Sequence, residues 1–216
     1  MTIYNATKEK KYSGNLAVIV DDCGYDLAPV QKLSGLPIKM SFAILPFKAN
    51  SSAALEVIQN NGKEAMLHLP MEPMDASAAS ESKMVTVAMT KDEVQAYTKE
   101  AVNSLPGIAG VNNHQGSKAT SNRSTMKAVL EVLKGEGLFF IDSNTYSKSI
   151  GDQAAEELGV ATARNQKFLD NSSDVDDKKK NIWAAAEMAD KNGVAVVICH
   201  ARPNTAKAWS EVYSAL

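Results

Sequence analysis

Residues 16–22 read LAVIVDD, an unbroken apolar run that ends in two adjacent carboxylates, Asp21 and Asp22. Six further runs of the same kind follow along the chain. They are MSFAILP at 40–46, AMLHLP at 65–70, IAGVNNH at 108–114, LFFIDS at 138–143, the stretch through KFLD at 167–170, and VAVVICH at 194–200. Continuous rather than alternating apolar runs are typical of parallel strands that are buried on both faces.

Helical patterns separate these runs. TKDE at 90–93 is a capping box that predicts a helix to about Ser104, before Pro106. A second helix is expected from Ser121 to the glycines at 135 and 137, and a third over 174–192. Strands that alternate with helices indicate a parallel sheet with right-handed crossovers. Residues 74–89 are small and polar, and we expect them to form a surface excursion.

The position of the polar residues separates two α/β architectures that fit this alternation. In a barrel, the carboxyl ends of the strands form one rim, where active sites are built, whereas an open sheet spreads them along an edge. Polar side chains end nearly every run: Asp21, Asp22, His68, Asn113, His114, Asp142, Ser143, Asp170, Asn171 and His200. A site built from residues this dispersed in sequence favours the barrel.

All three histidines of the chain, His68, His114 and His200, end apolar runs. One histidine in such a place is more often a packing residue than a ligand. Three at equivalent positions, joined by a double aspartate, point instead to a shared site. Two imidazoles and one carboxylate make a typical catalytic zinc set, with one position left for water. A second carboxylate and a third histidine then remain for proton transfer.

The Asp21–Asp22 pair suggests a division of labour, because adjacent residues at a strand end point in different directions. One carboxylate can bind a metal while the other faces water; the alternative is that the pair caps the next helix. Glu72 lies four residues after His68, but Pro70 and Pro73 exclude a regular helix there. We expect Glu72 to be a supporting residue of the site.

Composition excludes several classes of function. The 216 residues carry a net charge of −2 with a pI near 6.0, which argues against a nucleic-acid partner. No apolar run is long enough to span a membrane. The sequence also lacks the glycine-rich phosphate-binding loop of nucleotide-binding proteins and the GxSxG turn that carries the nucleophile of serine hydrolases. The opening residues are polar and show no signal peptide. We expect a flexible tail over 1–14 and one domain over 15–216.

Five segments together resemble the divergent polysaccharide deacetylases. They are LAVIVDDCG at 16–24, LHLPMEP at 67–73, GVNNHQGSKAT at 110–120, FIDSNT at 140–145 and FLDN at 168–171, in that family's order. The resemblance covers nearly the whole chain from residue 16. It implies a distorted seven-stranded (β/α) barrel and a bacterial envelope protein, periplasmic or secreted, whose secretion signal normally lies upstream.

The resemblance also implies roles for individual residues. Asp21 matches the aspartate that serves as catalytic base, and Asp22 matches the metal-binding aspartate. His68 stands where the first metal histidine stands. His200 matches the histidine that acts as general acid toward the leaving group.

One position departs from the family's wider superfamily. Its second metal histidine lies four residues after the first, where this chain has Glu72. The replacement implied here is His114. The ligand set expected for a divalent metal, zinc above all, is therefore Asp22, His68 and His114.

The function expected from these residues and the resemblance is metal-dependent removal of acetyl groups from the N-acetylated sugars of an envelope polysaccharide. The expected partner is thus a polysaccharide or oligosaccharide; oligomeric state is left open. Two alternatives remain: a carbohydrate-binding or scaffolding protein on the same barrel, and a hydrolase of another acyl substrate. Substrate-binding or supporting roles are expected for Glu72, Asn113, Ser117, Asp142 and Asp170.

Overall fold

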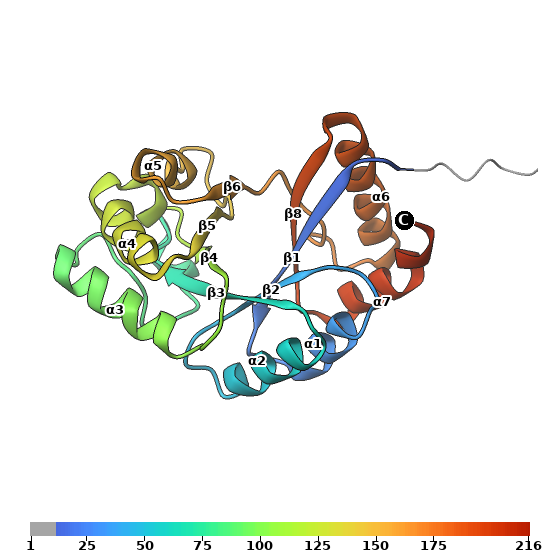
Figure 1. The fold of residues 1–216 in the computed structure, drawn as a ribbon, viewed down its shortest axis with the longest axis horizontal. Coiled ribbons are helices and arrows are strands. Elements are labelled where there is room, and N and C mark those ends of the chain that lie inside the picture. Colours follow the sequence, from blue (N-terminus) through green and yellow to red (C-terminus); the bar gives the residue numbers. More distant parts are fainter. Residues whose placement is uncertain (1–11) are drawn as a thin grey trace, which may run out of the picture.

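A computed structural model describes residues 12–216 of the chain. Fifteen helices and strands, besides short 3₁₀ turns, make up the described part (Figure 1). In chain order they are β1 (Asn15–Cys23), α1 (Leu27–Ser34), β2 (Ser41–Ile44), α2 (Ser51–Asn60), β3 (Glu64–Met71), α3 (Lys91–Asn103), β4 (Gly110–Gln115), α4 (Arg123–Glu136), β5 (Phe139–Asp142), α5 (Gly151–Leu158), β6 (Thr162–Arg164), β7 (Lys167–Phe168), α6 (Val175–Asn192), β8 (Val194–His200) and α7 (Pro203–Val212).

The strands form one sheet in the order β6-β5-β4-β3-β2-β1-β8-β7, and every pair is parallel. The sheet is curled into a half-barrel with the helices on its convex side (Figure 1). The predicted alternation of parallel strands and helices is confirmed. The barrel-like curvature agrees with the position of the polar residues at one rim.

The sheet has eight strands and not the seven predicted, because the segment after α5 divides in two. β6 pairs with β5, whereas β7, only two residues later, pairs with β8 at the opposite end of the strand order. The two intervening amides continue both pairings. Asn165 N donates to Asp142 O at 2.8 Å, and Gln166 N donates to Val196 O at 2.9 Å.

Two apolar layers hold the sheet in place. The larger one packs the outward side chains of the strands against the helices. The smaller one fills the concave side with Ile19, Ala43, Met66 and Ile198. Side chains alternate between the faces of a strand, so the residue two positions after an inner one is also inner. Asp21, His68 and His200 follow Ile19, Met66 and Ile198 in this way and lie directly above the inner layer.

The helix boundaries follow local sequence signals. Thr90 accepts from Glu93 N while the Glu93 side chain accepts from Thr90 N, so the predicted capping box is confirmed. α4 begins at Arg123, two residues later than predicted, with Asn122 as its cap, and Gly137 ends that helix in the left-handed conformation that glycine tolerates best. Asp174 caps α6 as the sequence indicates.

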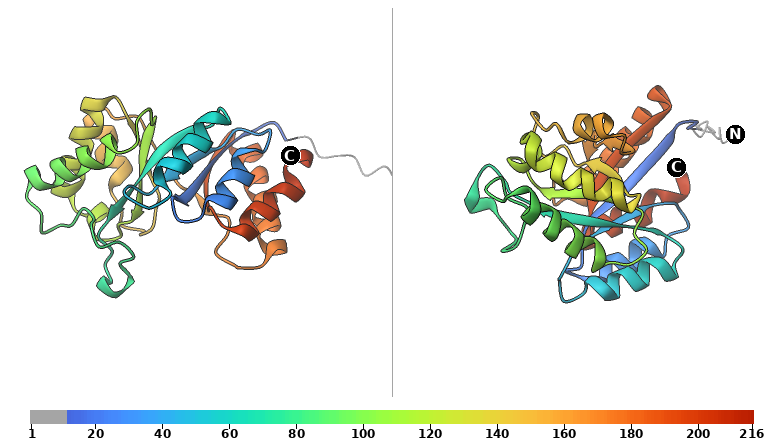
Figure 2. Two further views of the ribbon diagram at one scale, coloured as in Figure 1. Left: turned by 90° about the horizontal axis from the view of Figure 1, so that it is seen from below. Right: turned by 60° about the vertical axis from the view of Figure 1, so that its left-hand side comes forward.

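Residues 74–89 form the expected excursion between β3 and α3. A single 3₁₀ turn, Ala76–Ala78, and one bridge between Met71 and Val85 are its regular features. In Figure 2 this blue-green segment projects from the rest of the chain. It is tied back to the sheet at Val85, whose amide donates to Pro70 O at 2.9 Å.

The remaining chain features concern the tail, the cysteines and the membrane. Most of the predicted tail lies outside the described residues, and β1 begins at Asn15. Cys23 and Cys199 are on neighbouring strands, but both are buried free thiols. Within residues 12–216, no helix has the length and apolar character needed to cross a membrane.

Candidate metal and acid–base site

The ends of β1, β3, β4 and β8 bring the predicted polar residues together. In the strand register, Asp21 lies opposite His200, His68 opposite Asn112, and Pro70 opposite His114. Parallel strands end at the same edge, so residues from positions 21 to 200 become neighbours. The structure therefore has the single shared rim that the sequence predicts.

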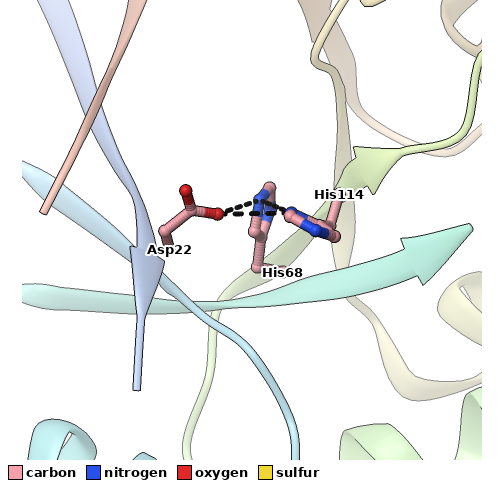
Figure 3. A group of neighbouring side chains, drawn as sticks. All are labelled: Asp22, His68 and His114. Atoms are coloured by element: carbon pink, nitrogen blue, oxygen red, sulfur yellow. Dashed lines mark hydrogen bonds and ion pairs between the residues drawn. The ribbon is translucent and has the colours of Figure 1, made fainter. Parts of the chain in front are cut away.

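Asp22, His68 and His114 point toward one another (Figure 3). Asp22 Oδ1 lies 3.2 Å from His114 Nδ1 and 3.5 Å from His68 Nε2, and the two nitrogens are 3.0 Å apart. All three ligand atoms lie within 4.8 Å of one another. The triad therefore offers two nitrogens and one oxygen to a common point.

A local break in β1 lets Asp22 join this group. Successive strand residues normally face opposite sides of a sheet. Here the register between β1 and β2 shifts between Val20 and Cys23, and Asp22 has φ 60°, in the left-handed region. The irregularity turns Asp22 toward the side that Asp21 already faces. Sequence alternation alone would have separated the two carboxylates.

The chemistry of the triad fits a divalent metal ion. Asp22 Oδ1 is buried and has no hydrogen-bond partner among the described residues, which is costly for an anionic oxygen unless a cation occupies its open side. Imidazole nitrogen and carboxylate oxygen are ligands that zinc and similar metals accept. Contacts with His114 and His68 outweigh burial and hold the pKa of Asp22 well below its usual range.

Asn112 fixes the orientation of His68. Its Nδ2 donates to Asp21 Oδ1 at 2.8 Å, so its Oδ1 faces His68 Nδ1 at 2.7 Å. An amide oxygen only accepts, and therefore the proton of His68 lies on Nδ1. In the neutral imidazole, which is the form that binds a metal, His68 Nε2 then presents a lone pair to the centre of the triad.

Asp21 lies beside the triad and is almost fully buried, at 2% exposure. Its Oδ2 is 3.6 Å from His68 Nε2. Burial raises the pKa of Asp21 above its ordinary value, against the lowering influence of His68 and His200. A carboxylate with a raised pKa is better suited to take a proton near neutral pH than an exposed one.

His200 is held by Asp170 on the opposite side of the site. His200 Nδ1 lies 2.8 Å from Asp170 Oδ1, and the His200 amide donates to Asp170 Oδ2 at 2.9 Å. Thr205 Oγ1 also donates to Asp170 Oδ2, at 2.7 Å. Burial alone would lower the pKa of His200, but the bond and charge of Asp170 raise it overall. The imidazole is thus a proton donor whose Nδ1 is occupied.

A cavity of about 330 Å³ opens over these groups. Phe168 forms an apolar wall, with its ring stacked on that of His200 at a centroid distance of 6.0 Å. The other lining residues are Asp21, Asp22, His68, Asn113, His114, Gln115, Ser143, Thr145, Asn171, His200 and Arg202. The metal triad and both proton-transfer candidates therefore face one space.

One known protein family matches nearly the whole chain. The sequence pattern of the divergent polysaccharide deacetylases matches residues 18–216. The chain belongs to the divergent polysaccharide deacetylase family. Since the match includes every strand end described above, the triad and its flanking residues are part of the family region.

Two bacterial relatives and one solved structure are similar to this deacetylase family member. YibQ of Escherichia coli K12 is 32% identical over 93% of the chain, which spans 62% of YibQ. A protein of Haemophilus influenzae is 33% identical over 88% of the chain and 68% of its own length. A crystal structure from Agrobacterium tumefaciens C58 shares the fold, with a TM-score of 0.87 at 17% identity, covering 94% of this chain and 85% of that one.

Glu72, four residues after His68, is not among the residues that line the cavity. Its carboxylate binds Lys118 Nζ at 2.6 Å and accepts from Val87 N at 2.7 Å. Those bonds anchor the 74–89 excursion to the start of the η2 turn (Ala119–Ser121). His114, one strand over, completes the triad instead.

The other predicted supporting residues differ in position. Asn113 lines the cavity, and its Oδ1 accepts from Ser143 N at 2.8 Å. Ser117 lies outside it and accepts from Met74 N at 2.8 Å. Asp142 is fully buried behind the rim, where its Oδ2 binds Arg164 at 3.1 Å and Ser149 at 2.6 Å. Asp142 thus holds β5, β6 and the α5 region together.

Asn112, Phe168 and Ser80 contact predicted site residues but were not predicted themselves. Asn112 shares the NNH segment with His114, and its inward position follows once β4 is known to end at the rim. Phe168 lies directly inside the predicted KFLD run. Ser80, whose Oγ is 2.8 Å from His114 Nε2, comes from the excursion, where no periodicity indicates which residue turns inward.

Proposed function

We propose that this chain is a metal-dependent hydrolase that removes acetyl groups from N-acetylated sugars of a bacterial envelope polysaccharide. The observation that carries the proposal is the convergence of the Asp22–His68–His114 triad with Asp21 and His200 on one cavity. Membership of the divergent polysaccharide deacetylase family supports a carbohydrate substrate. A periplasmic or secreted location is part of the same proposal.

The triad would hold the divalent metal, with zinc as the proposed ion. When bound, such an ion supplies Lewis acidity to an acyl carbonyl and to water. Asp22 contributes the anionic ligand, and the two imidazoles contribute neutral nitrogens. Asn112 keeps His68 in the tautomer that leaves Nε2 free to bind.

Asp21 and His200 would divide the proton transfers. Asp21 has the raised pKa of a buried carboxylate and takes the proton of the attacking water. His200 has a pKa raised mainly by Asp170, so it retains the proton that the departing amine needs. The two groups lie on paired positions of β1 and β8, which puts base and acid on neighbouring strands.

The shape of the cavity agrees with one acetylated sugar unit. Its volume of about 330 Å³ lies near the lower end of the range for small-molecule sites, about 300–1,000 Å³. Phe168 provides an apolar surface for a methyl group or sugar face, while Asn113, Thr145 and Asn171 provide polar groups for hydroxyls. A single residue of a longer chain would fill this space.

The deciding experiment measures acetate release from acetylated chito-oligosaccharides and peptidoglycan fragments. Metal-loaded protein is compared with protein treated with a chelator and with the Asp21→Asn variant. Turnover that needs both the metal and Asp21 would support the proposal. Absence of acetate from every substrate, with metal bound and the fold intact, would favour the carbohydrate-binding or scaffolding alternative.

A further inference from the structure

We propose that Ser80 is a positioning residue that holds His114 with Nδ1 turned toward the metal. This inference rests on the proposed metal site and assigns a role there to the 74–89 excursion. The ring of His114 presents Nδ1, and not Nε2, to Asp22 and His68. Its Nε2 faces away from them and meets Ser80 Oγ at 2.8 Å.

The two histidine ligands are thus oriented by different parts of the chain. His68 is fixed through Nδ1 by buried Asn112, so that Nε2 faces the triad. His114 is fixed through Nε2 by exposed Ser80, so that Nδ1 faces it. A metal-bound imidazole generally donates its other N–H to an acceptor, which sets the tautomer and the ring plane. Ser80 Oγ is that acceptor for His114.

A hydroxyl is suited to this contact because it both donates and accepts hydrogen bonds. Without a cation, the Nδ1 proton of His114 can point to His68 Nε2, 3.0 Å away, while Ser80 donates to Nε2 of His114. With a cation bound, Nδ1 of His114 must present a lone pair, so the ring proton lies on Nε2. The Nε2–H group then donates a hydrogen bond to Ser80 Oγ. The ring keeps its position in both cases.

The excursion is clamped so that Ser80 stays over the ring. Gln115, next to His114, donates from Nε2 to Ala78 O at 2.6 Å and accepts from Ser80 N at 3.4 Å. On the other side, Glu81 is bonded by Tyr25 Oη and paired with Lys48 Nζ. The segment is therefore attached to the rim on both sides of Ser80.

The test measures metal affinity by competition with a chromophoric chelator, which needs no substrate. Loss of a group that orients a histidine ligand typically weakens metal binding by about 10- to 100-fold. We expect that loss in Ser80→Ala and recovery in Ser80→Thr, which restores the hydroxyl. Ser77→Ala is the matched control, because Ser77 lies on the same exposed segment and, among residues 12–216, bonds within its own turn to Asp75.

A spectroscopic measurement separates orientation from simple loss of structure. In zinc-loaded protein labelled with ¹⁵N at histidine, His114 should show a metal-bound Nδ1 and a protonated Nε2. Ser80→Ala should broaden the Nε2 proton signal through exchange with solvent, with the His68 signals unchanged.

The outcomes distinguish this inference from the function on which it rests. Equal zinc affinity in the wild type and Ser80→Ala, or zinc bound through Nε2 of His114, would overturn the role of Ser80 and leave the metal site standing. A wild-type protein that binds no divalent ion would overturn both.

Discussion

The side-chain amide of Asn112 donates to Oδ1 of Asp21 across 2.8 Å, and both residues are buried. The same amide meets His68 through its oxygen, so a single neutral side chain links the candidate base to a candidate metal ligand. The hydrogen bond lowers the pKa of Asp21, while burial raises it more strongly. Asn112 therefore moderates how basic Asp21 becomes.

Replacing Asn112 by alanine should alter both stability and pH dependence. The variant leaves buried Asp21 and His68 each without one partner, at an expected cost of about 1–3 kcal/mol in unfolding free energy. Loss of the bond should raise the pKa of Asp21 further, which moves the acid limb of the rate profile to higher pH. Urea unfolding and a pH–rate profile measure the two effects; an unchanged acid limb would count against Asp21 as the base.

Metal content tests the triad directly. Protein purified without chelator should carry close to one zinc-like ion per chain. His68→Ala or His114→Ala should each remove most of it, because two remaining protein ligands are too few for a tight site. Glu157→Gln is the control, since Glu157 pairs with Arg123 outside the cavity. Full metal content in both histidine variants would exclude this ligand set.

Asp21 and Asp22 should have different functions. Asp22→Asn removes the anionic ligand and should weaken metal binding, whereas Asp21→Asn should keep the metal and abolish turnover. Metal analysis and acetate release on the same preparations provide both readouts. The opposite pattern would show that ligand and base are exchanged.

His200→Ala should reduce kcat by about 100- to 10,000-fold, the usual contribution of acid–base assistance, with metal content unchanged. It should also flatten the alkaline limb of the pH–rate profile. A variant with normal kcat would identify His200 as a packing residue of the rim.

Asp170→Asn tests the role of His200 as general acid without removing the imidazole itself. The Asp170 carboxylate favours the charged imidazole, so its removal should lower the pKa of His200. The alkaline limb should then move to lower pH, because His200 loses its proton earlier in a titration. Thr205→Val is a control that keeps the carboxylate and removes one of its donors. Movement of the limb to higher pH would contradict the assignment.

Arg202 and His200 line the same cavity. Asp170, bonded to the His200 ring, is the main influence that raises the pKa of His200. The sequence predicts supporting roles for both Asp142 and Asp170, and it is Asp170 that contacts His200. Asp142 instead binds Arg164 and Ser149.

The parts of the site that could be predicted follow from strand periodicity. His68 and His200 end long apolar runs, and regular alternation places them on the inner face. Asp22 could not be placed in this way, since its approach to the triad depends on a left-handed residue and a shifted register. Ser80 depends on the path of an irregular segment, which long-range bonds to Gln115 and Glu81 determine.

The short segment after α5 divides into β6 and β7, which lie at the two edges of the curled sheet. We call the junction between them, residues 165–166, the seam. At this seam the two edges are joined along the chain itself, by Asn165 and Gln166, and not by a ladder between long strands. The candidate metal triad is carried by β1, β3 and β4, each at least two positions away from β6 and β7 in the strand order. Phe168, in contrast, lies on the two-residue β7 strand, at the seam. Phe168 therefore forms the apolar wall of the cavity from a strand that carries none of the three triad residues, so the wall and the candidate ligand set belong to separate parts of the sheet.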